Sequence, residues 1–147
     1  MARKFIIVAL AALILAAGCA TISETPAIPT EEEKAQVIAT MTKGFTAVAA
    51  GMITPEGDSL RKEIDLRNLS YSMEFSSFSL LGSSPITGTF TLHGQSDAES
   101  NMVMDIRDGD TSLLIKGRME DIGDSKVQHV SELRLNGKLL DASFLNG

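Results

Sequence analysis

The chain has 147 residues, of which 44% are hydrophobic and 22% charged, and this composition suits one domain with one core. Its 19 acidic and 13 basic residues give a formal charge of −6, and the basic residues form no cluster beyond the first four positions, which argues against binding to nucleic acid. A single cysteine, Cys19, excludes an internal disulfide.

The first nineteen residues predict a secretory signal. Arg3 and Lys4 supply a positive start, residues 5–17 form an unbroken apolar run, and Gly18 is small enough to pass through a peptidase cleft. An apolar run of 13 residues is too short for a permanent membrane-spanning helix, which needs about 20. The segment is therefore expected to direct export and then to be removed.

The end of this segment, Leu15-Ala16-Ala17-Gly18-Cys19, resembles the lipobox of bacterial lipoproteins. The pattern's preferred leucine stands one position earlier here, at Leu15, and the resemblance covers residues 1–19 only. It implies cleavage before Cys19 and attachment of lipid, such as palmitate, to this residue. Because Ala20 follows the cysteine, the family's sorting habit implies the outer membrane, facing the periplasm, in a two-membrane bacterium; another bacterial membrane or the cell surface is the alternative. An ordinary signal, cut near Ala17 or Ala20 with a free thiol left behind, is the other interpretation.

Cleavage before Cys19 divides the chain into a signal peptide (1–18), a lipidated tether (19–29) and a single α+β domain (30–147). The tether contains Pro26 and Pro29 and has no apolar period. Loss of Arg3 and Lys4 leaves 11 basic against 19 acidic residues, a formal charge of −8. We therefore expect lipid on Cys19, rather than attraction to anionic lipid, to hold the protein at the membrane.

A helix is predicted to follow the tether. Thr30 and Glu33 have the spacing of a capping box, and the acidic residues 31–33 suit the positive end of a helix dipole. One apolar face recurs at helical spacing: Val37, Met41, Phe45, Val48 and Met52. Gly44 beside this face predicts a close approach to a sheet, and Gly51 followed by Pro55 predicts the helix end.

From Ser59 onward the apolar period becomes two, which predicts six or seven antiparallel strands in sequence order. A phase change before Phe78 predicts a bulge at Ser76-Ser77, and Asp108-Gly109 and Asn136-Gly137 predict hairpin turns, with a last strand over residues 138–144. The helix is the available cover for the apolar side of the sheet. The expected fold is α+β: one N-terminal helix packed on a curled antiparallel β-meander, with a half-barrel as one form.

Catalysis is not expected. The chain has no G-x-S-x-G, H-E-x-x-H or glycine-rich phosphate loop, and no nucleophile–base pair can be identified from the spacing. His93 falls on the polar face of its strand, whereas His129 shares a phase with Leu133 and Leu135 and is predicted to point inward. No cofactor is expected.

Methionine offers a weak candidate metal site. Met102 and Met104 share one strand face, and with a histidine, His129, they have the donor types that bind Cu(I). All six methionines after Met1 also fit the apolar periods, so filling of the core is the competing interpretation.

The sequence thus predicts a membrane-anchored, non-catalytic envelope lipoprotein with a binding or scaffolding role, and an envelope protein as a partner. The alternative is a carrier or sensor of an apolar ligand, such as a lipid, in a pocket between helix and sheet. Binding of Cu(I) is the third hypothesis. Cys19 is the only residue to which the sequence assigns a role, and the ligand-binding residues stay unidentified.

Overall fold

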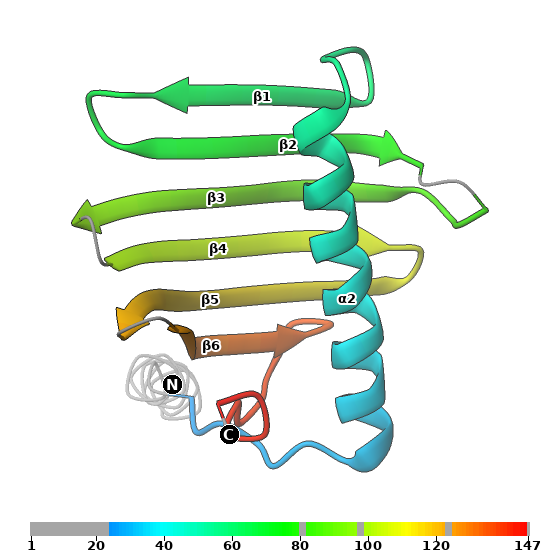
Figure 1. Ribbon diagram of the computed structural model, residues 1–147. Helices are drawn as coiled ribbons and strands as arrows, with labels where there is room; N and C mark the ends of the chain where they lie inside the picture. Colours follow the sequence, from blue (N-terminus) through cyan, green and yellow to red (C-terminus); the bar gives the residue numbers. More distant parts are fainter. Residues whose placement is uncertain (1–23, 80–81, 97–98, 123–124, 147) are drawn as a thin grey trace, which may run out of the picture.

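The computed structural model describes residues 24–79, 82–96, 99–122 and 125–146, which form one helix and one antiparallel sheet. The helix, α2, spans Glu31–Ile53. Strands that are consecutive in sequence are neighbours in the sheet, so the described residues form an open seven-stranded meander with β1 and β7 at its edges (Figure 1). The strands are β1 (Leu60–Asp65), β2 (Ser70–Phe78), β3 (Ile86–Ser96), β4 (Glu99–Asp108), β5 (Thr111–Ile122), β6 (Ser125–Leu135) and β7 (Lys138–Leu139). The predicted α+β class and meander are confirmed.

Helix α2 crosses one face of the sheet, which we call the inner face, at a steep angle to the strands (Figure 1). The predicted capping box is present at its start: the Glu33 N–H donates to Thr30 Oγ1 at 3.1 Å, and the Thr30 N–H donates to Glu33 Oε2 at 2.9 Å. These bonds satisfy two of the amides that a helix N-terminus leaves unpaired.

Small residues bring α2 close to the sheet. A Cβ atom at Gly44 would lie 2.6 Å from Ile106 Cδ1 and 2.7 Å from Met104 Sδ, so the predicted close approach at this glycine is confirmed. Gly51 makes a similar approach, since its Cβ would lie 2.9 Å from Met73 Sδ. The prediction that Gly51 ends the helix was wrong, because the helix continues to Ile53. Gly51 instead allows the helix to pack closely against Met73.

The buried face of α2 lies slightly to one side of the predicted stripe. Its centre consists of small residues rather than the large apolar ones, because only small side chains permit the close approach. Met52, predicted to lie on the apolar face, is 58% exposed. The buried residues are Val37, Thr40, Gly44, Ala47, Val48 and Gly51.

Two bulges set which strand residues face inward. The register of β2 against β3 shifts between Phe75 and Phe78, with Ser77 at φ 50°, which confirms the predicted bulge. Another shift, in β6, was not predicted: Lys116 pairs with Glu132 and Gly117 with Val130, leaving one extra residue in β6. A bulge reverses the phase of the residues beyond it.

The end of the chain folds back over the inner face. Asn136 and Gly137 have φ of 51° and 82°, which confirms the predicted hairpin turn. The strand that follows is only Lys138–Leu139, so the prediction of a strand to residue 144 was wrong. The Asp141 carboxylate accepts bonds from Ser143 and turns the chain, which packs Phe144 and Leu145 against the core.

Residues 24–29, the described part of the predicted tether, lie against this end of the sheet. The Ala27 N–H donates to the Leu139 carbonyl at 3.1 Å, and the Asp141 N–H donates to the Ala27 carbonyl at 2.8 Å. Glu24 pairs with Arg134 at 2.9 Å. The chain is therefore held to the domain from Glu24 onward.

Candidate functional site: an apolar groove

The inner face is covered over most of its area and open at one corner, near the β1–β2 turn. A row of directly paired residues crosses it from β1 to β6: Ile64, Tyr71, Leu92, Met102, Gly117 and Val130. Within this row Met102 is 1% exposed and Val130 8%, whereas Tyr71 and Leu92 are half-buried and Ile64 is 66% exposed. The β1–β3 part of this row thus lacks the cover that the row has on β4–β6.

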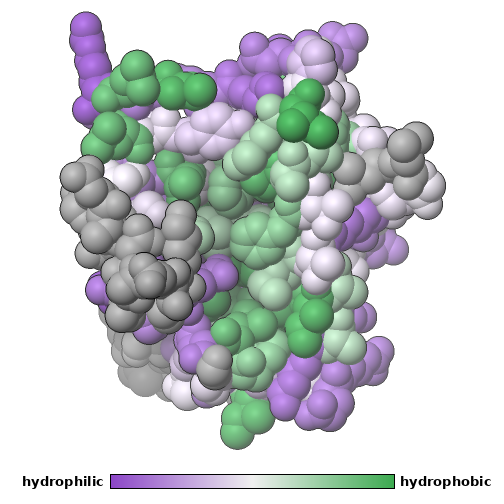
Figure 2. Space-filling view, viewed as in Figure 1, coloured by the Kyte–Doolittle hydropathy of each residue, from purple (hydrophilic) through white to green (hydrophobic). Residues whose placement is uncertain are grey.

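Two open depressions lie on this uncovered part, with volumes of about 750 Å³ and 280 Å³. They share Ile64, Tyr71 and Leu92 and so form one continuous groove. We call it the apolar groove. Figure 2, which views the inner face, shows hydrophobic surface at the β1–β2 end of the sheet and over the groove. Its hydrophobic lining residues are Met52, Ile64, Leu66, Leu69, Tyr71 and Leu92.

Local sequence explains why the groove stays open. Pro55 lies just beyond the last helical residue, Ile53, so α2 cannot continue over the end of β1. Strand β1 is at the edge of the sheet, and the turn that follows it carries Leu66 and Leu69, which are 81% and 60% exposed. The groove is therefore walled by the end of the helix on one side and by this turn on the other.

Polar groups stand mainly at the two ends of the groove. At the helix end, Glu56 Oε1 accepts from the Lys62 N–H at 2.7 Å, and Lys62 Nζ donates to the Thr54 carbonyl at 2.7 Å. At the turn end, a hydrogen bond from the Asn68 side chain lowers the pKa of Asp65 below its ordinary value. Between them, burial raises the pKa of the Tyr71 phenol, as expected for a hydroxyl on an apolar floor.

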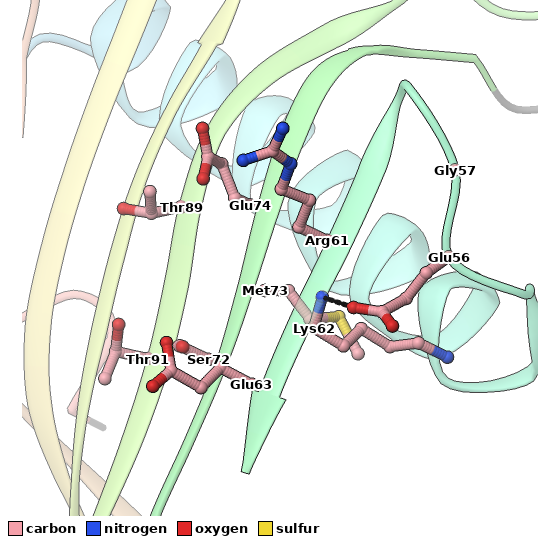
Figure 3. A pocket seen from close by; sticks show the side chains of 10 residues that line it. All are labelled: Glu56, Gly57, Arg61, Lys62, Glu63, Ser72, Met73, Glu74, Thr89 and Thr91. Carbon is pink, nitrogen blue, oxygen red and sulfur yellow. Dashed lines mark hydrogen bonds between the residues drawn. The ribbon is translucent and has the colours of Figure 1, made fainter. Parts of the chain in front are cut away.

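The outer face of β1–β3 holds a third depression, of about 800 Å³, with a different character (Figure 3). Charges of both signs line it, and Arg61 and Glu74 extend toward one another from neighbouring strands (Figure 3). The threonines Thr89 and Thr91 complete its floor. Mixed charge at an open surface is typical of a solvated strand face, and we assign it no site.

The structure does not bring the candidate Cu(I) ligands together. Met102 and Met104 are buried on the inner face, at 1% and 0% exposure. His129 lies on the outer face, where Nε2 is 3.8 Å from the Glu120 carboxylate, so the prediction that it points inward was wrong. The bulge in β6 is the cause, because it separates the phase of His129 from that of Leu133. His93 is exposed on the outer face as well.

Three further findings concern metal binding and attachment to a membrane. Within the described ranges, no three or more His, Cys, Asp and Glu side chains converge as a metal site would require. No described helix is long and apolar enough to cross a bilayer. Cys19, the predicted lipidation site, lies outside the described residues.

The groove residues were not predicted from the sequence, although a signal was available. Leu66 and Leu69 flank Arg67 and Asn68 in a stretch between two strands, where a turn is normally polar. Met52 and Ile53 stand together at a helix end. Apolar residues in a turn or at a helix end lie beyond the core, and this position distinguishes them from the buried apolar residues.

Comparisons with family models, with curated proteins and with solved structures find no match to this chain.

Proposed function

We propose that the protein is a non-catalytic envelope lipoprotein, anchored through Cys19, that binds an apolar ligand of the acyl-chain class in the apolar groove. In this proposal the open sheet acts as a half-barrel whose hollow α2 fills only in part. The observation that carries it is the row from Ile64 to Val130, which is buried on β4–β6 and open on β1–β3. Ligand sites in proteins are concave and mostly apolar, with a few polar groups that orient the ligand.

The dimensions and chemistry of the groove suit a chain-like ligand. Its larger part, about 750 Å³, is within the range of about 300–1,000 Å³ usual for small-molecule sites. Each methylene removed from water contributes about 0.8 kcal/mol, so an acyl chain laid over Leu92 and Ile64 would gain several such increments. Lys62 at the helix end of the groove would favour an anionic head group.

A scaffolding role through the edge of the sheet has less support. The Lys62 N–H at the β1 edge is occupied by the Glu56 carboxylate, at 2.7 Å. Gly57 exchanges backbone bonds with Leu60 on the same edge, at 3.0 and 3.4 Å. These contacts occupy the first half of the edge and limit strand addition by a partner.

Two measurements test ligand binding. Native mass spectrometry of the mature protein purified from cells should show a co-purifying lipid. A Cys19→Ala variant of the mature chain, which bears no acyl group of its own, should bind a fluorescent C16 fatty acid saturably. Leu92→Gln should weaken this binding at least about tenfold, the loss expected when apolar burial of a chain is disrupted.

Thr89→Gln is the matched control, because Thr89 lies on β3 but on the outer face. It should bind the fatty acid as the parent does. The carrier proposal would be excluded if native mass spectrometry shows the protein without a bound lipid and the Cys19→Ala protein does not bind the fatty acid saturably.

The lipid anchor is tested separately. The amino-terminal peptide of the mature protein should carry acyl groups on Cys19, and Cys19→Ser should leave the membrane fraction. If the variant and the wild type fractionate alike and neither yields an acylated peptide, the anchor is absent.

A further inference from the structure

The turn between β1 and β2, residues 66–69, is built as an ordered structure. Asp65 Oδ1 accepts from the Arg67 and Asn68 N–H groups at 2.9 and 3.3 Å, and Asp65 Oδ2 accepts from the Asn68 side chain at 2.8 Å. The Leu69 carbonyl accepts from the Gly94 N–H of β3 at 2.8 Å. The turn is therefore fixed both within itself and to the sheet.

This ordered turn presents apolar side chains to solvent. Leu66 is 81% exposed and Leu69 60%, and Leu69 adopts φ 51°, a left-handed conformation that leucine seldom takes. A polar residue or glycine would fit this position with less strain. A single exposed leucine needs no explanation, but these two continue directly into the groove through Ile64. Leucine in this strained and exposed position indicates an apolar environment outside the molecule.

The position of the lipid anchor identifies that environment. Only residues 20–23 lie between Cys19 and Glu24, so five residue steps join Cys19 to the point where the described chain is already paired with Arg134. Five residues reach at most about 18 Å. Seven strands at about 4.8 Å spacing make a sheet about 29 Å wide, so this tether keeps the domain within less than its own width of the bilayer. In Figure 1 the first described residues, below β6, and the β1–β2 turn lie at opposite edges of the sheet, both toward its left-hand side.

We propose that the β1–β2 turn inserts Leu66 and Leu69 into the bilayer that holds Cys19, so that the groove opens onto the lipid. This inference depends on the lipid anchor of the proposed function. The mature chain has a formal charge of −8, so the leucines rather than attraction to anionic lipid drive the insertion. An acyl chain would then pass between bilayer and groove without crossing water.

A site-specific probe tests the insertion. The thiol of Cys19 is blocked in the lipidated protein and no other cysteine is present, so an introduced cysteine can be labelled alone. Arg67→Cys, between the two leucines, carries an environment-sensitive NBD dye. Asp110→Cys, exposed in the β4–β5 turn at the opposite end of the strands, is the matched control. Both lipidated proteins are reconstituted in phosphatidylcholine vesicles.

At position 67 we expect blue-shifted emission and quenching by lipids that carry a doxyl group on the acyl chain. The dye at position 110 should instead be quenched by aqueous iodide. Adding Leu66→Asn and Leu69→Asn to the Arg67→Cys protein should abolish the doxyl quenching while the protein stays on the vesicles. Asparagine accepts the left-handed conformation, so these changes should not unfold the domain.

Equal iodide quenching at both positions of a vesicle-bound protein overturns the insertion and leaves the lipid anchor intact. That result would assign the exposed leucines to a protein partner or a second copy of the chain. If neither protein floats with vesicles and Cys19 is unmodified, the anchor and the insertion both fail. Doxyl quenching at position 67 in a protein that binds no fatty acid supports insertion and removes only the carrier role.

Discussion

The β4–β6 half and the β1–β3 half of the register row that crosses the inner face have the same kind of side chains and opposite exposures, although β1–β3 residues outside this row, such as Leu60 and Met73, are buried. On β4–β6, Met102 and Val130 are closed in, and Phe144 and Leu145 of the returning chain end pack on the core. On β1–β3, Ile64 belongs to the same register row and is 66% exposed. Alternation of apolar and polar residues predicts which face a side chain takes, but burial depends on what lies over that face.

The difference shows where the structure keeps apolar surface in water. Exposing it costs free energy that a polar substitution on β1–β3 would remove. A few contacts fix the boundary between the two halves, and each can be altered. The predictions that follow test this boundary, beginning with the largest effect.

Truncation of one residue from each half gives the sharpest contrast. Met102→Ala should lower the free energy of unfolding by about 2–5 kcal/mol, the usual cost of a cavity left by a buried methionine. Ile64→Ala should change it by less than about 1 kcal/mol, because most of the side chain is already in water. Urea denaturation of both variants measures the difference. Similar losses in the two variants would mean that the halves are equally covered.

The side chain of Asn146 fastens the end of the chain to β6, and its removal should expose part of the covered half. Asn146 Oδ1 accepts from the Val130 N–H at 2.7 Å, and Asn146 Nδ2 donates to the Val130 carbonyl at 3.1 Å. Asn146→Ala should cost about 1–3 kcal/mol, since it leaves half-buried backbone groups without partners. Hydrogen exchange at the Val130 amide should rise in step. Unchanged exchange there would show that the Asn146 side chain does not hold the cover in place.

Loss of the helix cap should affect the same half. Thr30 caps α2, and Glu33 of this cap also pairs with Lys138 of β7 at 2.7 Å. Thr30→Ala should lower the free energy of unfolding by about 0.5–2 kcal/mol, the range measured for loss of such caps. Thr42→Ala, in the middle of the exposed side of α2, is a control that should change it little. A similar loss in both variants would count against a capping effect.

Most of the fold was predictable because it follows local rules. The capping box at Thr30, the bulge after Phe75 and the turn at Asn136-Gly137 each have a short sequence signal with a physical cause. The β6 bulge had a similar signal, since Val130 and Leu133 are three residues apart as Phe75 and Phe78 are, but Val127 stands in phase with Leu133 and hid the change. The inward placement of His129 failed for that reason.

The groove was less predictable because it depends on tertiary cover. A period of two puts Ile64 on the same strand face as Leu60, and its position in the register row agrees. Whether α2 covers Ile64 depends on the angle at which the helix crosses the strands and on how far the helix extends beyond Gly51. The periodicity of apolar residues reveals neither. An apolar pair in a turn, Leu66 and Leu69, was the available clue.

The smallest expected effect concerns the contact that fixes α2 on the side away from the groove. Lys43 Nζ donates to Asp108 Oδ1 at 2.8 Å and to Ser84 Oγ at 2.5 Å, and the Ser84 hydroxyl donates to Asp108 at 2.9 Å. The bond from Lys43 lowers the pKa of Asp108 below its ordinary 3.8. The folded state therefore favours the ionised carboxylate.

A lowered pKa fixes the direction of the pH effect. The stabilisation from Asp108 is fully present above the ordinary pKa of 3.8 and is lost as the pH falls through the lower folded-state value. Asp108→Asn should cost about 0.5–1 kcal/mol at pH 7, a modest value because the pair is partly solvated. The deficit relative to the parent should shrink as the pH falls below the ordinary pKa, which urea titrations across the acid range can measure.

The neighbouring Asp110 provides the control for this pair. It lies exposed in the same turn, and Asp110→Asn should change the free energy of unfolding by less than about 0.5 kcal/mol. A deficit of Asp108→Asn that stays constant as the pH falls would mean that the carboxylate acts through packing rather than charge. In that case Gly44 and its neighbours, rather than this ion pair, would set the position of α2 and with it the boundary of the open half.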